Sequence, residues 1–251
     1  MLEASSLSFR YSTKGPWIFR DVSVRAAAGE VFAVLGPNAR GKTTMLKCLA
    51  GLTRPVAGAV EATGTVGYVP QSHAVMFSFS VLDMVLMGRA RTVKIYSTPT
   101  SADRAAARDS LHRVGIEHLA DRDYTGLSGG ERQLVLIARA LVSDCATIVL
   151  DEPAAALDLR NQARVLTVLR ALADDGMAVV MTTHHPDHAL HVAERSMLMV
   201  SPDDQRIGPT RELLTGELLT EMYGVPIVTA DIETPSATRR LTVPDFGRGI
   251  A

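Results

Sequence analysis

The stretch Gly36-Pro37-Asn38-Ala39-Arg40-Gly41-Lys42-Thr43 decides the fold of this chain. It fits the pattern G-x-x-x-x-G-K-[ST], in which glycines let backbone N–H groups wrap around a phosphate. In this pattern the lysine brings a positive charge to the β- and γ-phosphates, and the Thr43 hydroxyl completes the coordination of Mg²⁺. Because such a pattern also occurs by chance, the neighbouring residues have to support it.

A buried strand before the loop and a helix after it supply that support. EVFAVLG at 30–36 is apolar, β-branched and without alternation, which is typical of a strand buried on both faces. Residues 43–50 have the pattern of a helix, whose N-terminus favours anions. We therefore predict a nucleotide site rather than a structural glycine turn. Its residues are Gly36, Pro37, Asn38, Ala39, Arg40, Gly41, Lys42, Thr43 and Thr44.

Two carboxylates stand at the end of another apolar run, Ile148-Val149-Leu150-Asp151-Glu152. Ligands of open α/β sheets bind at the carboxyl ends of the strands. We expect Asp151 to hold Mg²⁺ through its water shell and Glu152 to orient or deprotonate the attacking water. The alternative is a solvated strand end with Pro153 starting a turn, which the upstream phosphate loop disfavours.

The order of the predicted elements indicates an α/β fold. Residues 146–151 and 177–183 resemble buried strands, and the helix between them is amphipathic, which favours a parallel sheet with right-handed crossovers. The first thirty residues have a strand period of two, and helical signals run from Ser80 to about Val142. Ser101 is the expected N-cap of one of these helices.

The segment Leu127-Ser128-Gly129-Gly130-Glu131-Arg132-Gln133 precedes an apolar helical stripe. Ser128 and Glu131 fit a capping box, but a helix start does not need two consecutive glycines, which lower helix stability. Two consecutive glycines are expected if another molecule or subunit approaches the backbone closely at this point. Here the chain resembles the ATP-binding cassette (ABC) ATPases, whose signature is this LSGGE-type sequence. The resemblance extends to about residue 225.

The resemblance implies a P-loop NTPase (RecA-like) core with an N-terminal antiparallel β subdomain and an inserted helical subdomain. It implies an ABC ATPase domain at 1–230, with the helical subdomain at about 72–142. The tail 231–251, with its prolines and late glycines, is expected to be a loose C-terminal extension. The implied ligands are ATP and Mg²⁺, and the implied reaction is ATP hydrolysis.

The resemblance also implies roles for single residues. Tyr11 would stack on adenine, unless it is an ordinary strand-face tyrosine. Gln71 would bridge Mg²⁺ and the attacking water to a membrane partner, and His184 would sense the γ-phosphate. Asp158 matches the D-loop aspartate. Two subunits would pair head to tail, so that the signature residues of one cap the γ-phosphate held by the other. The implied metal ligands are Thr43, Gln71 and Asp151, the catalytic residues are Glu152, His184 and Gln71, and the partner's nucleotide meets Ser128, Gly129 and Gly130.

Two departures from the family pattern bear on the site. Ala39 stands where glycine is usual, and a Cβ at a positive φ costs roughly 1 kcal/mol or more. Ala154 and Ala155 stand where Thr-Ser is usual, so two hydroxyls near the expected dimer seam are missing. Because Lys42, Asp151, Glu152 and His184 are all present, we still expect hydrolysis.

Cassette ATPases of different kinds differ in features that the sequence shows. Repair-type proteins insert a long coiled coil between the position of Gln71 and the signature, and here that interval is short and without heptads. Translation-type proteins carry two cassettes, and exporters often fuse membrane spans to theirs. The longest apolar runs here are about five residues, against roughly 20 for a span. The expectation is therefore an importer subunit, with a soluble ATPase or an exporter subunit as alternatives.

The stretch MFSFSVLDMVLMGRAR at 76–91 favours the importer. Its methionines and phenylalanines are either core or a groove for a helix of a membrane partner. With LDLRNQ and TTHHPDHAL, it is similar to importers of iron–siderophore, haem or cobalamin, and to relatives carrying molybdate or tungstate. The expected assembly is a homodimer beneath two integral membrane permease subunits, fed by an external substrate-binding protein, at the cytoplasmic face of the inner membrane.

Composition agrees with this expectation. Lysine plus arginine is 26 against 27 acidic residues, so no net positive charge draws the chain to nucleic acid. Apolar residues make up 47% of the chain, which is ordinary for a globular protein. No secretory signal is visible in MLEASSLSFRYS. Cys48 and Cys145 are too few for a disulfide framework and are expected in the core.

Overall fold

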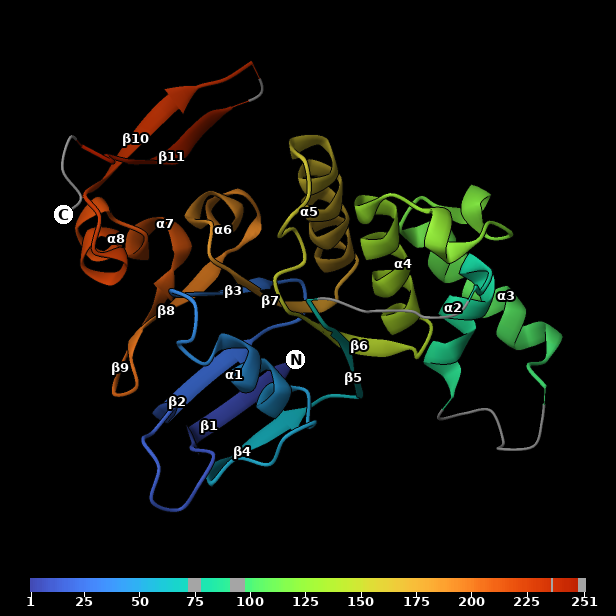
Figure 1. Cartoon of the computed structure of the whole chain (residues 1–251), viewed down its shortest axis with the longest axis horizontal. Helices are drawn as coiled ribbons and strands as arrows, with labels where there is room; N and C mark the ends of the chain where they lie inside the picture. The colour runs from blue at the N-terminus through green and yellow to red at the C-terminus, as the bar shows by residue number, and fades with distance from the viewer. Residues whose placement is uncertain (72–77, 91–97, 236, 248–251) are drawn as a thin grey trace.

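A six-stranded sheet in the order β5-β6-β7-β3-β8-β9 forms the centre of the molecule (Figure 1). The structure is a computed structural model, and it describes residues 1–71, 78–90, 98–235 and 237–247. Neighbouring strands from β5 to β8 run parallel, and β9 is antiparallel to β8. The strands are β3 (Val31–Leu35), β5 (Thr65–Val69), β6 (Cys145–Leu150), β7 (Ala178–Thr183), β8 (Arg195–Ser201) and β9 (Asp204–Pro209). The predicted parallel α/β sheet is confirmed.

Alternate residues of β3 enter two separate cores. Val31, Ala33 and Leu35 belong to one apolar cluster, whereas Phe32 and Val34 belong to the other. Such a division follows from the period of two along a strand, and it requires apolar side chains on both faces. The prediction that this strand is buried on both faces is therefore confirmed.

An antiparallel sheet and one helix cover the second cluster. The sheet has the order β2-β1-β4, and helix α1 lies between it and the central sheet (Figure 1). These elements are β1 (Leu2–Phe9), β2 (Phe19–Ala26), β4 (Ala57–Ala62) and α1 (Lys42–Leu49). The N-terminal antiparallel β subdomain is thus present.

The remaining helices lie against the first cluster and at one side of the sheet. The bounds are α2 (Val81–Leu86), α3 (Ser101–Arg113), α4 (Gly129–Leu141), α5 (Leu159–Asp174), α6 (Pro186–Val192), α7 (Thr210–Leu213) and α8 (Gly216–Tyr223). Helices α2, α3 and α4 pack together as the predicted helical region. The N-cap of α3 is Thr100 and not Ser101, because Thr100 and Asp103 form a reciprocal capping box.

The C-terminal tail is not a loose extension. Strands β10 (Ile227–Glu233) and β11 (Thr238–Pro244) form an antiparallel hairpin (Figure 1). The expectation of a loose extension is wrong because Pro235 falls in the turn and Pro244 ends the second strand, so neither proline interrupts the ladder. The hairpin lies against α6, where Asp187 accepts hydrogen bonds from the Thr242 N–H at 2.8 Å and the Thr242 hydroxyl at 3.0 Å.

Two further expectations concern cysteines and membrane spans. Cys48 and Cys145 are free and buried, and burial raises the pKa of the Cys48 thiol to about 11, which suits a packing role. Within the described ranges, no helix has both the length and the apolar character needed to cross a bilayer.

Candidate nucleotide site

The phosphate loop connects the end of β3 to the start of α1. Gly41 is the N-cap of α1 at φ 90°, without a side-chain cap, and the first turn holds no acidic residue. The N–H groups of this turn are therefore open to an anion. The Lys42 side chain is almost fully buried, and its Nζ donates to the backbone oxygens of Gly36 at 2.7 Å and Pro37 at 3.2 Å. These bonds fold the ammonium group back over the loop.

A pocket of about 400 Å³ lies over this loop. It is lined by Tyr11, Ile18, Asn38, Ala39, Arg40, Gly41, Lys42, Thr43, Thr44, Gln71 and Glu152. All of these except Ile18 were predicted site residues, so the structure brings most of the predicted set into one cavity. Ile18 was missed because it is an apolar residue outside every motif of the sequence. A Cβ on Gly41 would lie 2.2 Å from the Ile18 side chain, so Gly41 needs its glycine for space as well as for φ.

Tyr11 stands at the rim of the pocket. It lies beyond the end of β1 and is 75% exposed, which argues against an ordinary strand-face tyrosine. Its ring meets Phe9 edge-on at 5.1 Å between centroids, and its hydroxyl lies 2.7 Å from Thr44 Oγ1. The ring is held beside the loop, where an adenine could stack on it.

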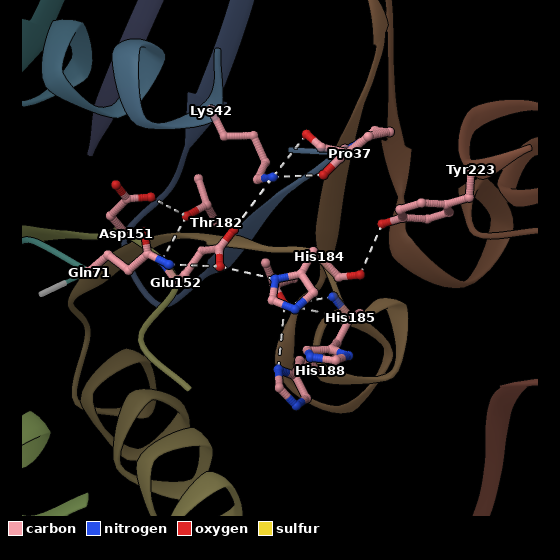
Figure 2. A network of polar contacts seen from close by, with 12 residues as sticks. Pro37, Lys42, Gln71, Asp151, Glu152, Thr182, His184, His185, His188 and Tyr223 are labelled. Carbon is pink, nitrogen blue, oxygen red and sulfur yellow. Dashed lines mark hydrogen bonds and ion pairs between the residues drawn. The ribbon is translucent and has the colours of Figure 1, made fainter. Parts of the chain in front are cut away.

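The Glu152 carboxylate is the centre of a polar network (Figure 2). It lies 3.5 Å from Lys42 Nζ, 3.3 Å from Gln71 Nε2 and 3.0 Å from His184 Nδ1. Lys42 is the first residue of α1, and the other three residues lie just after the ends of β5, β6 and β7. Asp151 is buried beside Glu152. The structure thus brings together every predicted residue of the hydrolytic centre.

Two neighbours of this network were missed in the sequence. The Thr182 hydroxyl donates to Asp151 Oδ1 at 2.8 Å, and the Tyr223 hydroxyl donates to the backbone oxygen of His184 at 3.1 Å. Burial, and the nearby Glu152 charge, raise the pKa of Tyr223, so its hydroxyl stays protonated. A polar residue inside the apolar run AVVMTT was a signal for Thr182, whereas Tyr223 had no local signal.

The pKa values of the two histidines that follow His184, His185 and His188, are both lowered. Burial lowers the pKa of His188 to about 4, and burial with the neighbouring His184 lowers the pKa of His185. The imidazole of His188 lies 3.4 Å from Gln162 Oε1 and 3.4 Å from Thr183 Oγ1. We therefore keep the prediction for His184 alone.

The residues at this centre fit Mg²⁺ bound with nucleotide phosphates. Mg²⁺ prefers oxygen ligands and keeps several waters, and it usually takes only one or two carboxylates from the protein. Thr43 and Gln71 line the pocket, and Asp151 stands at the adjoining strand end with one oxygen engaged by Thr182. This donor set is the one expected for a magnesium–nucleotide site.

The signature segment starts α4 and lies outside that pocket. Ser128 and Glu131 form the predicted capping box, with the Ser128 N–H donating to the Glu131 carboxylate at 2.9 Å. None of Ser128, Gly129 and Gly130 is among the residues that line the pocket over the phosphate loop. The structure therefore does not bring these signature residues to the loop of the same chain.

Gly130 packs against the start of α5. A Cβ on Gly130 would lie 2.3 Å from Asn161 Cγ and 2.7 Å from Asn161 Cβ. Asn161 is in turn bonded to Asp158, the N-cap of α5, through its N–H at 2.8 Å and its Nδ2 at 3.0 Å. One contact thus joins the signature to the predicted D-loop aspartate, and Asn161 is a residue that sequence reasoning missed.

The contact predicts different effects for the two signature glycines. Gly130→Ala should lower the free energy of unfolding by about 1–3 kcal/mol, because Asn161 must shift. Gly129→Ala is the matched control, since its Cβ would lie 3.5 Å from the Leu157 side chain, an ordinary contact. Denaturant unfolding of both variants measures the difference. Equal stability of the two variants would contradict the packing described here.

Ala39 has a φ of 64°, so the departure noted in the sequence places a Cβ in the left-handed region. Ala39→Gly should relieve about 1 kcal/mol of strain, offset in part by the added entropy of the unfolded chain. If the strain also resists closure on phosphate, ATP binding should tighten by up to about tenfold. Equilibrium nucleotide binding and thermal unfolding test this. Unchanged stability and affinity would mean that the loop accepts alanine without strain.

Ala154 and Ala155 replace the usual Thr-Ser pair before Asp158, so small apolar side chains occupy these two positions. Ala154 is buried, and Ala156 has a φ of 58°. Leu157 follows, and its backbone oxygen accepts a hydrogen bond from Gln162 Nε2 at 2.9 Å. The D-loop is thus held by backbone contacts that need no hydroxyl at these two positions.

The fold and the site together define a class: an ATPase in which a phosphate loop, a strand-end acid pair and a strand-end histidine meet at one edge of a parallel sheet. The family model of the ABC transporter matches residues 19–155, more than half of the chain. This chain belongs to the ABC transporter family and is one of its ATP-binding ATPases.

Individual relatives agree with that assignment. The molybdate import ATP-binding protein MolC of Haemophilus influenzae is 41% identical over 227 residues, covering 90% of this chain and 89% of that protein. The hemin import ATP-binding protein HmuV of Nocardia farcinica is 38% identical, covering 85% and 78%. A solved inward-facing structure of a metal-chelate type ABC transporter is 39% identical with a TM-score of 0.92, covering 98% and 97%.

Proposed function

We propose that this chain is the ATP-hydrolysing subunit of an importer, in which ATP binding and hydrolysis drive the uptake of a metal chelate or an oxyanion. The observation that carries the proposal is the Glu152 network, in which Lys42, Gln71 and His184 converge on one buried carboxylate. A carboxylate so placed at the mouth of a phosphate pocket is suited to orient or deprotonate a water.

The chain's own residues divide the hydrolytic work. Lys42 and the N–H groups of α1 hold the β- and γ-phosphates, and Tyr11 takes the base. Glu152 receives a proton from the attacking water, while His184 contacts the γ-phosphate. Thr43, Gln71 and the water shell of Asp151 would hold Mg²⁺, which when bound would supply positive charge opposite the phosphate oxygens.

The functional unit in this proposal is a homodimer. The pocket over the phosphate loop is open and lacks the signature residues, and Ser128 and Gly129 are exposed. A second copy placed head to tail would bring its own Ser128, Gly129 and Gly130 over the γ-phosphate. ATP would then bind best to the closed pair, and hydrolysis would reopen it.

The importer assignment rests on the relatives. Two of them are named for import of molybdate and of hemin, and the similar solved structure is of a metal-chelate type transporter. We place this chain beneath two permease subunits on the cytoplasmic face of the inner membrane, supplied by an external binding protein. Since the substrate does not touch this subunit, uptake assays with molybdate, tungstate, haem, cobalamin and iron–siderophore decide the cargo.

The helical region offers the surface for the permease. Of the predicted apolar set, Met84 is in the core, Phe79 is partly buried against it, and Met87 is 42% exposed at the end of α2. Met76 and Phe77 lie outside the described residues. Met87 is therefore the exposed member that a partner helix can reach, and thioether side chains adapt to irregular helix surfaces.

The docking prediction is that Met87→Asp leaves ATP hydrolysis by the isolated protein within about threefold of wild type, because the site is exposed. The same variant should lose co-purification with the permease in detergent, since a charge would enter an apolar contact. Leu52→Asp is the matched control, because Leu52 is 60% exposed but follows α1, away from the helical region. If Met87→Asp retained the permease and uptake, this surface would not be the docking site. If wild type captured no membrane protein, the alternative of a cassette ATPase without a transport partner would replace the importer.

A further inference from the structure

Thr182 lies at the meeting point of the two acidic residues. It is the fifth residue of β7, and its side chain is wholly buried. The paired positions of β6 and β7 end at Leu150 and Met181, so Asp151 and Thr182 are the next residues of the two strands. Where the backbone ladder ends, the Thr182 side chain continues the connection between the strands (Figure 2).

The Thr182 hydroxyl makes two hydrogen bonds whose directions are determined. The Glu152 N–H can only donate, and it lies 2.8 Å from Thr182 Oγ1. The hydroxyl proton is therefore free to point at Asp151 Oδ1, also at 2.8 Å. A hydroxyl has one proton and two lone pairs, so a single Thr182 side chain satisfies both contacts at once.

The bond from the Glu152 N–H to Thr182 acts on an unusual backbone conformation at Glu152. Glu152 has a φ of 48°, a left-handed conformation that non-glycine residues adopt only where the surroundings hold them. The bond from its N–H to Thr182 restrains that conformation, and the conformation aims the Glu152 side chain at Lys42 and His184. The same hydroxyl orients Asp151, whose other oxygen stays available for the water shell of a metal ion.

We propose that Thr182 is a positioning residue that fixes Asp151 and Glu152 relative to each other. The inference rests on the proposed function, because it assumes the roles given there to the two carboxylates. The neighbouring threonine does not share this role. Thr183 Oγ1 accepts from the His185 N–H at 3.0 Å and lies near His188, on the other side of the strand.

The test compares three substitutions with wild type. Thr182→Val keeps the shape but removes the hydroxyl, Thr182→Ser restores it, and Thr182→Cys offers a weak donor of similar size. Thr147→Val is the matched control: Thr147 is a buried threonine of β6, and its hydroxyl has no hydrogen-bond partner among the described residues. Each variant is checked by thermal unfolding before its kinetics are measured.

For Thr182→Val we expect kcat for ATP hydrolysis to fall by about 10- to 100-fold, the effect of losing a hydrogen bond to a charged group. Thr182→Ser should recover to within about threefold of wild type, Thr182→Cys should lie between, and Thr147→Val should match wild type.

A second readout does not depend on turnover. Binding of a non-hydrolysable ATP analogue is measured with Mg²⁺ and with a chelator. If Thr182 orients Asp151, Thr182→Val should need about tenfold more Mg²⁺ for half-maximal enhancement of binding, while binding without metal stays unchanged. If Thr182 had only a structural role, Thr182→Val would weaken binding of the analogue both with Mg²⁺ and with the chelator.

The outcomes separate this inference from the proposed function. An inactive Glu152→Gln with a fully active Thr182→Val would overturn the inference and leave the function standing. A wild type without ATPase activity, or an active Glu152→Gln, would overturn the function itself. If Thr182→Val does not fold, the serine and cysteine variants decide: a serine variant that is folded but as slow as the cysteine variant would overturn the inference.

Discussion

Replacing Glu152 with glutamine will lower ATP hydrolysis by about 100-fold or more while ATP binding persists. The amide keeps the shape of the side chain and its hydrogen-bonding oxygen, but it cannot receive the proton of the attacking water. The Glu152 side chain is only 9% exposed, and it is the carboxylate among the residues that line the pocket. Turnover is measured by phosphate release, and binding by a fluorescent nucleotide.

The dimeric state gives a second readout for Glu152→Gln. If hydrolysis reopens the pair, the variant should accumulate as an ATP-bound dimer that size-exclusion chromatography resolves. Glu117→Gln is the control, because Glu117 is an exposed carboxylate in the helical region whose contact with His112 is on the surface. Turnover of Glu152→Gln equal to wild type would remove Glu152 from the reaction.

Lys42→Met will weaken ATP binding by about 100-fold or more, since it removes the charge that meets the β- and γ-phosphates. It also leaves Glu152 as a buried carboxylate without its cation, and loss of one partner of a buried pair costs about 3–5 kcal/mol when desolvation is complete. Because the pair is 3.5 Å apart and faces a pocket, we expect a smaller stability loss of about 1–2 kcal/mol.

The control for Lys42→Met lies on the same helix. Lys47 is exposed in the last turn of α1, so Lys47→Met removes one positive charge from α1 without touching the pocket. Equilibrium ATP binding and denaturant unfolding are measured for both variants. Equal affinity of the two would show that the net charge of the helix, and not the position of Lys42, governs binding.

The local parts of the site could be predicted from the sequence because each is a contiguous stretch with a chemical requirement. The loop from Gly36 to Thr43, the acid pair and the signature each need particular residue types at neighbouring positions. The capping box of Ser128 and the buried strand after Glu30 followed from the same kind of local reasoning, and the structure confirms both.

The contacts between these parts could not be predicted in the same way. Nothing near Thr182, Tyr223 or Asn161 in the sequence shows which distant group each one meets, because those contacts form only when strands and helices pack. The C-terminal hairpin was missed for a different reason. Its pairing joins residues across a turn that contains Pro235, and a proline in the sequence does not show whether it interrupts a strand or lies in a turn.

The hairpin determines how the chain could be shortened. A protein cut after residue 230 would keep half of β10 without β11, and a single strand has no ladder to stabilise it. It would also leave the Asp187 carboxylate without the Thr242 backbone and hydroxyl donors, and it would remove the Arg239 contact from His191. Anyone designing a minimal version should therefore keep the hairpin through Pro244.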